Sequence, residues 1–253
     1  MIRTNAKIIE NKFISSNGLK MILLAPKIAE IAKAGQFIEI DTAGATLLKK
    51  PISIADIDQN HGTITLYYKL IGKGTKALSN LKINSQIDII GSLGNGFSLP
   101  TSAFYAVGGG IGIPPIYFLS KSTKQAGIAL LGAKTAAEII LLEEFNQLKN
   151  ITNVICTTDD GSFGKKGFII SELEEIFKKE KRIVYACGPF PLLKAVAEFC
   201  KTEAVECFVC MEAYMACGVG ACMGCVIPTI SGMQRVCKEG PVFNALDILW
   251  DEF

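Results

Sequence analysis

Short apolar runs separated by turn residues dominate residues 1–100 of the chain. Runs rich in Ile, Leu, Val, Phe and Tyr alternate with turn sequences such as Ser16-Asn17-Gly18 and Gln59-Asn60-His61-Gly62. Strands this short and this closely spaced predict an antiparallel β-barrel, with one helix after Gly74-Thr75. The expected strands are Ala6–Ser15, Leu19–Leu24, Gln36–Asp41, Thr63–Leu70 and Gln86–Ile90, and the expected helix is Lys76–Leu81.

The pattern changes over residues 101–205, where apolar runs of strand length alternate with longer helical stretches. This alternation predicts a parallel sheet with helices on its faces. The expected strands are Ala103–Val107, Ile128–Leu131, Asn153–Thr157 and Arg182–Ala186, and the expected helices are Pro114–Ser120, Ala136–Leu148, Phe168–Lys179 and Pro189–Lys201.

Residues 206–253 are rich in glycine and cysteine and end in an apolar, partly acidic tail. A segment of this length cannot build a core of its own. A bound metal centre is one physical way to hold it together. We therefore expect three regions: a barrel over 1–100, an α/β domain over 101–205 and a small metal-binding segment over 206–253.

Composition and charge narrow the classes of function. The 253 residues are 49% apolar and 20% charged, which is ordinary for a soluble globular protein. A formal net charge of +2 gives no case for binding nucleic acid. No stretch reaches the about 18–20 apolar residues of a membrane helix, and no apolar signal segment follows Met1. We expect a cytoplasmic protein.

The cysteines are clustered. None of the nine precedes Cys156, and Cys217, Cys222, Cys225 and Cys237 follow the spacing C-x4-C-x2-C-x11-C. The first three have the spacing by which plant-type ferredoxins hold a 2Fe–2S cluster, and the interleaved glycines allow a loop to wrap it. A structural zinc site is the alternative, although zinc sites more often pair two C-x2–4-C knuckles. The spacing favours iron–sulfur.

The other cysteines have a simpler interpretation. Cys207 and Cys210 lie in a strand-like apolar run, and we expect them to be core residues. Cys156 and Cys200 fall in an expected strand and helix, where a cysteine usually acts as a small buried hydrophobe. The only histidine, His61, lies in a polar turn, and no Ser/His/Asp or Cys/His arrangement indicates a hydrolase. We assign no catalytic residue.

Two turns in the second region suit a dinucleotide. A glycine-rich loop, Gly108-Gly109-Gly110-Ile111-Gly112, follows an expected strand and opens an expected helix, where a pyrophosphate can approach the backbone. The turn Cys187-Gly188-Pro189 ends the last strand of the same region. Both turns should lie at the carboxyl edge of the sheet, where ligands bind in this architecture. A purely structural turn is the alternative interpretation of the glycine loop.

The barrel region holds weaker signals. Lys50-Pro51-Ile52-Ser53 offers a cation and a hydroxyl in an extended segment, and Gly72-Lys73-Gly74-Thr75 precedes a short helix. Judged on spacing alone, each is an ordinary strand end or turn. Lys69 and Lys73 would ordinarily be solvated surface charges.

Taken together, these motifs resemble the ferredoxin-reductase superfamily, and within it the electron-transfer subunits of NAD-dependent dihydroorotate dehydrogenases. The resemblance runs from about Lys7 to Asp251. It rests on the motifs above and on Asp159-Asp160-Gly161-Ser162-Phe163-Gly164. Its most specific part is the sequence from Glu212 to Cys225, with the wording Met-Ala-Cys-Gly-Val-Gly-Ala-Cys.

The resemblance implies cofactors and partners. The barrel would bind FAD, the α/β domain would bind NAD as electron acceptor, and the last segment would bind a 2Fe–2S cluster. An FMN-containing catalytic subunit would oxidise dihydroorotate, in a heterotetramer of two plus two chains serving pyrimidine biosynthesis. The flavin contacts would fall on Lys50, Pro51, Ile52, Ser53, Tyr67, Tyr68, Lys69, Gly74 and Thr75; the dinucleotide contacts on Gly108, Gly109, Gly110, Gly112, Cys187, Gly188 and Pro189; and the cluster ligands would be Cys217, Cys222, Cys225 and Cys237.

One position departs from the family pattern. Lys50 stands where the family usually has arginine, and a lysine offers a phosphate a point charge instead of two parallel hydrogen bonds. FAD binding could then lean on Lys49 or Lys69. Lys134, after the second expected strand of the α/β domain, suits either a neutral role or a contact to a 2′-phosphate, so NAD and NADP both fit the residues themselves.

Two other functions are compatible with these motifs. A related subunit of an NADPH–ferredoxin reductase, a sulfide dehydrogenase or a hydrogenase would carry the same cofactor signals. A zinc-stabilised binding protein on a reductase scaffold would instead contain zinc but neither iron nor flavin. The agreement among flavin, dinucleotide and cluster signals favours an electron-transfer protein.

Overall fold

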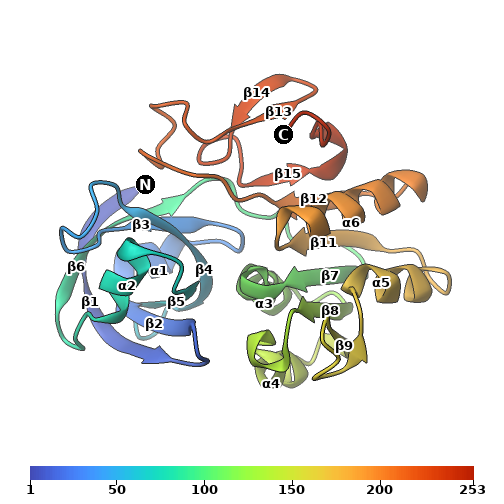
Figure 1. Ribbon diagram of the computed structural model, residues 1–253, viewed down its shortest axis with the longest axis horizontal. Coiled ribbons are helices and arrows are strands. Elements are labelled where there is room, and N and C mark those ends of the chain that lie inside the picture. The colour runs from blue at the N-terminus through green and yellow to red at the C-terminus, as the bar shows by residue number, and fades with distance from the viewer.

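The computed structural model describes residues 1–253 and shows three parts (Figure 1). A barrel lies beside a helix-covered sheet, and the last part of the chain lies above both. None of the helices is long and apolar enough to span a lipid bilayer. The expected combination of an antiparallel barrel and a parallel-sheet domain is confirmed.

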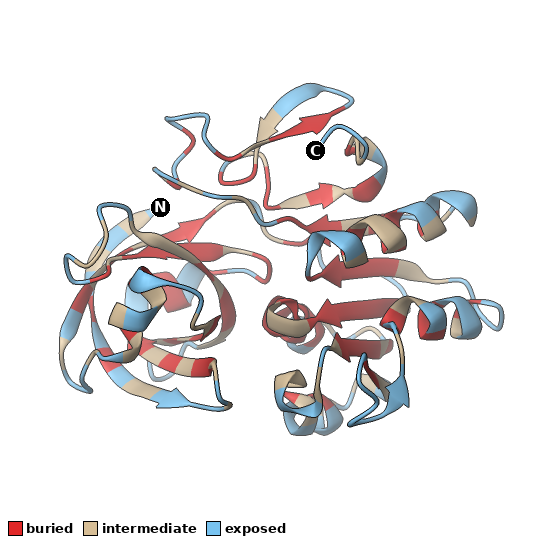
Figure 2. Ribbon diagram, viewed as in Figure 1, coloured by how far each residue is buried: buried red, intermediate tan, exposed pale blue.

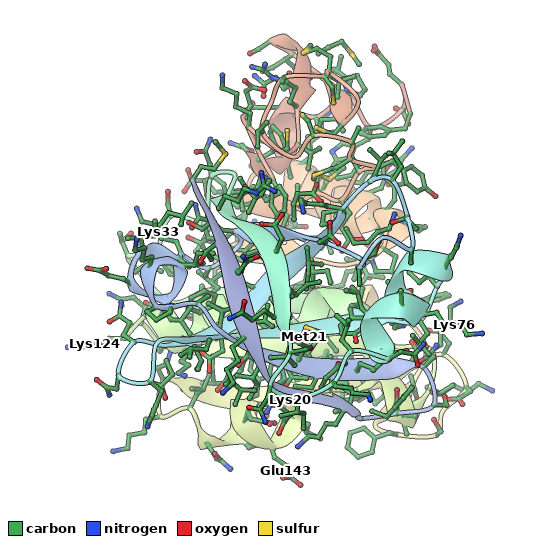
Figure 3. All side chains as sticks on the ribbon, turned by 90° about the vertical axis from the view of Figure 1, so that its left-hand side faces the viewer. Lys20, Met21, Lys33, Lys76, Lys124 and Glu143 are labelled. Carbon is green, nitrogen blue, oxygen red and sulfur yellow. The ribbon has the colours of Figure 1, made fainter.

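Six strands close the barrel in the order β1-β2-β5-β4-β3-β6, and every pair is antiparallel. Side chains alternate between the inside and the outside of the strands. On β2, Met21 is fully buried inside the barrel, whereas Lys20 beside it pairs with Glu10 on the outside (Figure 3). The strands are β1 Ile2–Phe13, β2 Gly18–Leu24, β3 Phe37–Ile40, β4 Lys50–Asp58, β5 Thr63–Lys69 and β6 Gln86–Leu93.

Three elements of the barrel differ from expectation. The sequence predicts only an extended segment over Lys50 to Ser53, where β4 begins. The structure accommodates Pro51 opposite Glu39 of β3, before the pairing of β4 with β5 begins at Ile54. Helix α1 (Pro26–Ile31) is not predicted; it buries Ile28 and Ala29 against the barrel. Helix α2 (Lys73–Ser79) begins three residues earlier than expected.

The second sheet has seven strands in the order β10-β9-β8-β7-β11-β12-β15. All neighbours are parallel except β15, which runs antiparallel to β12. The first and last of these strands extend the sheet at its two edges. The strands are β7 Phe104–Gly109, β8 Gly127–Ala133, β9 Ile151–Thr158, β10 Lys165–Lys166, β11 Ile183–Cys187, β12 Cys207–Cys210 and β15 Val242–Asn244.

Helices cover both faces of this sheet. On the side of the barrel lie α3 (Ile113–Ser122) and α4 (Leu142–Gln147), and on the far side lie α5 (Ile169–Phe177) and α6 (Phe190–Thr202). Short 3₁₀ turns complete the fold: η1 Gly110–Gly112, η2 Ala136–Glu138 and η3 Ala245–Asp247.

The expected helix Ala136–Leu148 is wrong in its first half. The structure has η2, then an extended stretch, and then α4, with Leu141 in the left-handed conformation at φ +63°. Four consecutive apolar residues, Ile139 to Leu142, cannot all lie on one face of a helix. Burial of Leu141 therefore takes precedence over helix propensity, and it leaves η2 next to the barrel.

Two hydrophobic cores hold the parts together. Figure 2 shows buried residues along the barrel strands, the large sheet and the last part of the chain. One joins the barrel interior to α3 and α4 and includes Ile54, Tyr67, Ile113 and Phe145. The other joins the far face of the sheet to the last part of the chain and includes buried cysteines. The expected core positions of Cys207, Cys210 and Cys200 are confirmed, while Cys156 is only partly buried.

Candidate functional site

The cysteine-rich stretch connects two neighbouring strands of the large sheet, β12 and β15. It leaves the sheet after β12, forms the cysteine loop and the hairpin of β13 (Val226–Thr229) and β14 (Gly232–Arg235), and returns as β15. Cys222 is exposed, Cys217 is partly exposed, and Cys225 and Cys237 are buried. The loop thus lies near the surface while its base is anchored in the core.

The four thiols stand as two pairs. Cys222 neighbours Cys217 and lowers its pKa, and Cys225 neighbours Cys237 and raises its pKa. Backbone amides add further donors: Ala221 N lies 3.3 Å from Cys217 Sγ, and Cys237 N lies 3.4 Å from Cys225 Sγ. No group of three or more metal-ligating side chains converges on one point.

This donor set fits a binuclear cluster. A 2Fe–2S cluster is held by four thiolates, two on each iron, and amide N–H groups pointing at sulfur support it. Two sulfur pairs with N–H donors match that requirement. A single tetrahedral zinc ion would instead need four ligands around one centre.

The acidities of the thiols differ along the loop. Burial alone would raise the pKa of Cys217, but amide donors from Val219 and Cys222 outweigh it and lower that pKa to about 6. Burial and the neighbouring Cys225 raise the pKa of Cys237 to about 12. The exposed end of the loop therefore favours a thiolate, the form that binds metal.

The cysteine loop packs tightly at two glycine positions, one against the barrel and one against the last part of the chain. Gly218 has φ +65°, and a Cβ there would lie 2.5 Å from Cγ of Glu39 on β3. Gly220 has φ +84°, and a Cβ there would lie 2.6 Å from Cδ of Lys238. Both glycines are required by backbone conformation and by close approach.

Glu39 is a residue that sequence reasoning missed. It is 1% exposed, and neither carboxylate oxygen has a hydrogen-bond partner. Burial and the nearby Cys217 raise its pKa to about 7, against the lowering effect of Lys50 and Lys49. The signal in the sequence was a single acid within the apolar run Phe37 to Ile40.

We expect Glu39→Gln to remove a pH dependence of stability. The folded protein holds the Glu39 proton up to about pH 7, whereas the unfolded value is 4.5. The free energy of unfolding should therefore fall as pH rises between these values, by on the order of 3 kcal/mol, and the glutamine variant should abolish this fall. Urea unfolding across this pH range measures it. The exposed Glu143→Gln is the control, and an unchanged slope in Glu39→Gln would contradict the expectation.

The candidate flavin residues lie on adjacent strands. Lys50 on β4 forms no ion pair, and its side chain lies over Gly74 at the start of α2, where a Cβ would meet it. By contrast, Lys49 is held by Asp41 and Asp88, and Lys69 is held by Glu138. Lys50 is therefore the free cation of the three lysines that could serve a flavin phosphate.

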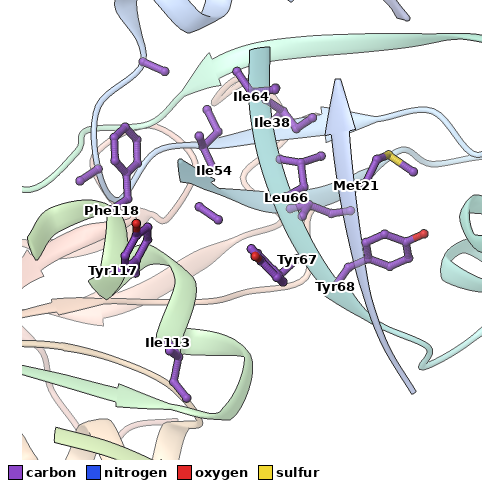
Figure 4. Packing of buried hydrophobic residues seen from close by; sticks show 14 of the residues in the cluster. Met21, Ile38, Ile54, Ile64, Leu66, Tyr67, Tyr68, Ile113, Tyr117 and Phe118 are labelled. Carbon is purple, nitrogen blue, oxygen red and sulfur yellow. The ribbon is translucent and has the colours of Figure 1, made fainter. Parts of the chain in front are cut away.

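The strand β5 divides its candidate residues between two sides (Figure 4). Tyr67 faces α3, while Tyr68 points into the barrel and donates to Asn11 Oδ1 at 3.0 Å. On β4, Ile52 is buried, whereas Pro51 and Ser53 are partly exposed. Thr75 Oγ1 accepts from the amides of Ile71 and Gly72 and so fixes the turn before α2.

The glycine loop and the Cys187 turn touch one another. A Cβ at Gly112 would meet the carbonyl group of Cys187, and one at Gly109 would lie 3.0 Å from Cδ of Pro189. Gly110 is different, because its φ is +52° and it faces Lys69 and Glu138 across the gap to the barrel. Among these loop glycines, Gly110 is the one where a Cβ would meet no atom closer than 3.7 Å.

The Cys187 thiol is buried at the end of β11, opposite Cys210 on β12. The hydrogen bond with Cys210 and burial hold the pKa of Cys187 well above its usual range. It is therefore a neutral thiol at physiological pH. His61 lies in an exposed turn and pairs with Asp58.

Two of the three parts of the chain match known protein families. The family described as iron-sulfur cluster binding domain of dihydroorotate dehydrogenase B matches residues 212–249. The oxidoreductase NAD-binding domain matches residues 106–198. The first region contains all four cysteines of the loop, and the second contains both the glycine loop and the Cys187 turn.

Individual relatives extend the likeness to the whole chain. The dihydroorotate dehydrogenase B (NAD(+)) electron transfer subunit of Caldanaerobacter subterraneus subsp. tengcongensis is 40% identical over 222 residues, covering 85% of this chain and 87% of that protein. The protein of the same description from Bacillus caldolyticus is 35% identical and covers 98% of both. A chain in the structure of an NADH-dependent reduced ferredoxin-NADP oxidoreductase superposes with a TM-score of 0.88 at 26% identity, covering 98% of this chain and 91% of that one. With this coverage and identity, the chain belongs to the family of dihydroorotate dehydrogenase B electron transfer subunits.

Proposed function

We propose that this chain passes electrons to NAD from a catalytic partner subunit. The partner oxidises dihydroorotate, as a step of pyrimidine biosynthesis. Its redox groups are a 2Fe–2S cluster and FAD. The observation that carries the proposal is the cysteine loop, which packs on the barrel at Gly218 and is joined to the edge of the nucleotide-type sheet through β12 and β15. Family membership supports the same function.

Each group has residues suited to hold it. Cys217 with Cys222, and Cys225 with Cys237, would each ligate one iron of the cluster. The free cation Lys50 would face the FAD pyrophosphate, and Gly110 would face that of the dinucleotide. The remaining assigned contacts are Pro51, Ile52, Ser53, Tyr67, Tyr68, Lys69, Gly74 and Thr75 for FAD, and Gly108, Gly109, Gly112, Cys187, Gly188 and Pro189 for NAD.

FAD links hydride chemistry at a nicotinamide to single-electron chemistry at an iron–sulfur centre. The chain's own residues position these groups and exclude water through two continuous cores. We assign no acid or base for an organic substrate, so dihydroorotate oxidation belongs to the partner. We propose that the partner binds FMN and that two copies of each chain assemble. Nine free cysteines are consistent with the reducing cytoplasm.

One observation favours a second function. The superposed ferredoxin-NADP oxidoreductase chain covers 98% of this chain at 26% identity. The same cofactor set could therefore serve a subunit of an NADPH–ferredoxin reductase, a sulfide dehydrogenase or a hydrogenase. The electron partner, and not the cofactor content, distinguishes these functions.

Anaerobic co-expression with an FMN-type dihydroorotate dehydrogenase from the same source tests the proposal. We expect the purified complex to form NADH from dihydroorotate and NAD only when this chain is present. If the complex contains FAD and iron but forms no NADH from dihydroorotate, the result would instead favour a subunit of a ferredoxin reductase, a sulfide dehydrogenase or a hydrogenase. A colourless protein containing zinc would contradict both.

A further inference from the structure

Two ion pairs cross from the barrel to the α/β domain. Lys69 Nζ on β5 lies 3.0 Å from Glu138 Oε2 on η2, and Lys121 Nζ on α3 lies 2.7 Å from Asp56 Oδ2 on β4. Only the first lies at the glycine loop. A Cβ at Gly110 would be 3.7 Å from Lys69 Nζ and 4.0 Å from Glu138 Oε2.

The Lys69–Glu138 pair closes the gap between barrel and glycine loop. The two side chains are 24% and 18% exposed. Apolar residues, among them Leu19, Ile111 and Ile140, line the same gap, and the cavity left there is only about 10 Å³. This is about the smallest space that holds one water molecule. A nicotinamide dinucleotide can therefore not pass between Gly110 and the barrel while the pair is intact.

A phosphate group and the Glu138 carboxylate are alternative anionic partners for Lys69. A dinucleotide at the glycine loop brings a pyrophosphate with two negative charges. Lys69 is the cation nearest to Gly110, and a carboxylate already holds it. Glu138 thus offers Lys69 the same kind of anionic partner that a phosphate would offer.

We propose that Glu138 is an internal competitor of the dinucleotide: its carboxylate holds Lys69 until a pyrophosphate displaces it, and takes Lys69 back when the product leaves. This inference rests on the proposed dinucleotide site. Glu138 is a positioning residue, which lowers dinucleotide affinity and speeds release. The break in the expected helix Ala136–Leu148 is what brings Glu138 to this place.

The test compares dinucleotide binding among variants of the full FAD-loaded chain. We expect Glu138→Gln to tighten the binding of ADP-ribose and of NADH by roughly three- to tenfold, mostly through slower dissociation. A change of this size corresponds to the interaction energy of a partly buried ion pair. Calorimetry and stopped-flow dissociation measure both quantities. The gain should shrink at high salt, because salt screens the charges.

Asp56→Asn is the matched control, because it breaks the other cross-domain ion pair without touching the glycine loop. Its affinity for ADP-ribose should equal that of the wild type. In a Lys69→Gln background, Glu138→Gln should give no gain, because no cation is left to release.

Several results would overturn the inference. Binding by Glu138→Gln that is unchanged or weaker would exclude competition by the carboxylate. An equal gain in Asp56→Asn would mean that a loosened domain contact, and not Lys69, governs affinity. If the wild type bound neither ADP-ribose nor NADH, the proposed dinucleotide site itself would fall, and this inference with it.

Discussion

Cys222→Ser should lose the 2Fe–2S absorbance while FAD stays bound. We place Cys222 as one of the four sulfur ligands, next to Cys217 in the exposed half of the loop. Its loss leaves one iron without a full ligand set. Even changes in outer-shell partners reduce metal affinity 10–100-fold, so we expect iron content to drop by at least roughly tenfold. Iron analysis and the electron paramagnetic resonance signal of the reduced protein measure the loss.

Two further variants make this result specific. Cys222→Ala removes any chance that a serine oxygen replaces the sulfur. Cys156→Ser is the control, because Cys156 is a partly buried cysteine outside the loop and should leave the cluster intact. A full cluster signal in both Cys222 variants would show that Cys222 is not a ligand.

Gly110→Val should abolish NADH oxidation without removing FAD or iron. A valine side chain would fill the gap to Lys69 and Glu138 where we place the pyrophosphate. We expect kcat/KM for NADH with ferricyanide to fall about a hundredfold, since misplacement by 1 Å can cost that much. Flavin and cluster spectra report whether the rest of the site survives.

Backbone strain needs its own control, because Gly110 has φ +52° and valine is disfavoured there. Gly44 has φ +79°, and a Cβ at that position would have no atom within 4 Å, so Gly44→Val carries comparable strain in open space. It should keep near wild-type kinetics. Similar losses in both variants would assign the effect of Gly110→Val to folding.

The architecture was predictable where local pattern decides structure. Alternating apolar residues identified five barrel strands, whereas Pro51 near the start of β4 and the aspartates Asp56 and Asp58 near its end obscured the pattern of that strand. The four cysteines were found from spacing, because a metal centre constrains positions close together in sequence. Their role as ligands stays a prediction, to which the structure adds amide donors at the sulfurs of Cys217 and Cys225.

Long-range contacts were beyond prediction. Glu39 and Gly218 meet although they are far apart in sequence, and only the packed structure leaves the carboxylate without a partner. Glu138 was expected within a helix, and its ion pair with Lys69 depends on the break at Leu141. Both residues owe their environment to tertiary packing, which takes precedence over local propensity.

The cysteine loop begins and ends at one place. Cys210 at the end of β12 is paired with Val242 at the start of β15, so the chain leaves the sheet and re-enters it between two hydrogen-bonded neighbours. Insertions with adjoining ends disturb a host domain least. The loop therefore has the geometry of an insertion. A simple hairpin turn could join β12 to β15 and leave a complete flavin and nucleotide reductase, to which the loop adds a site for single-electron transfer.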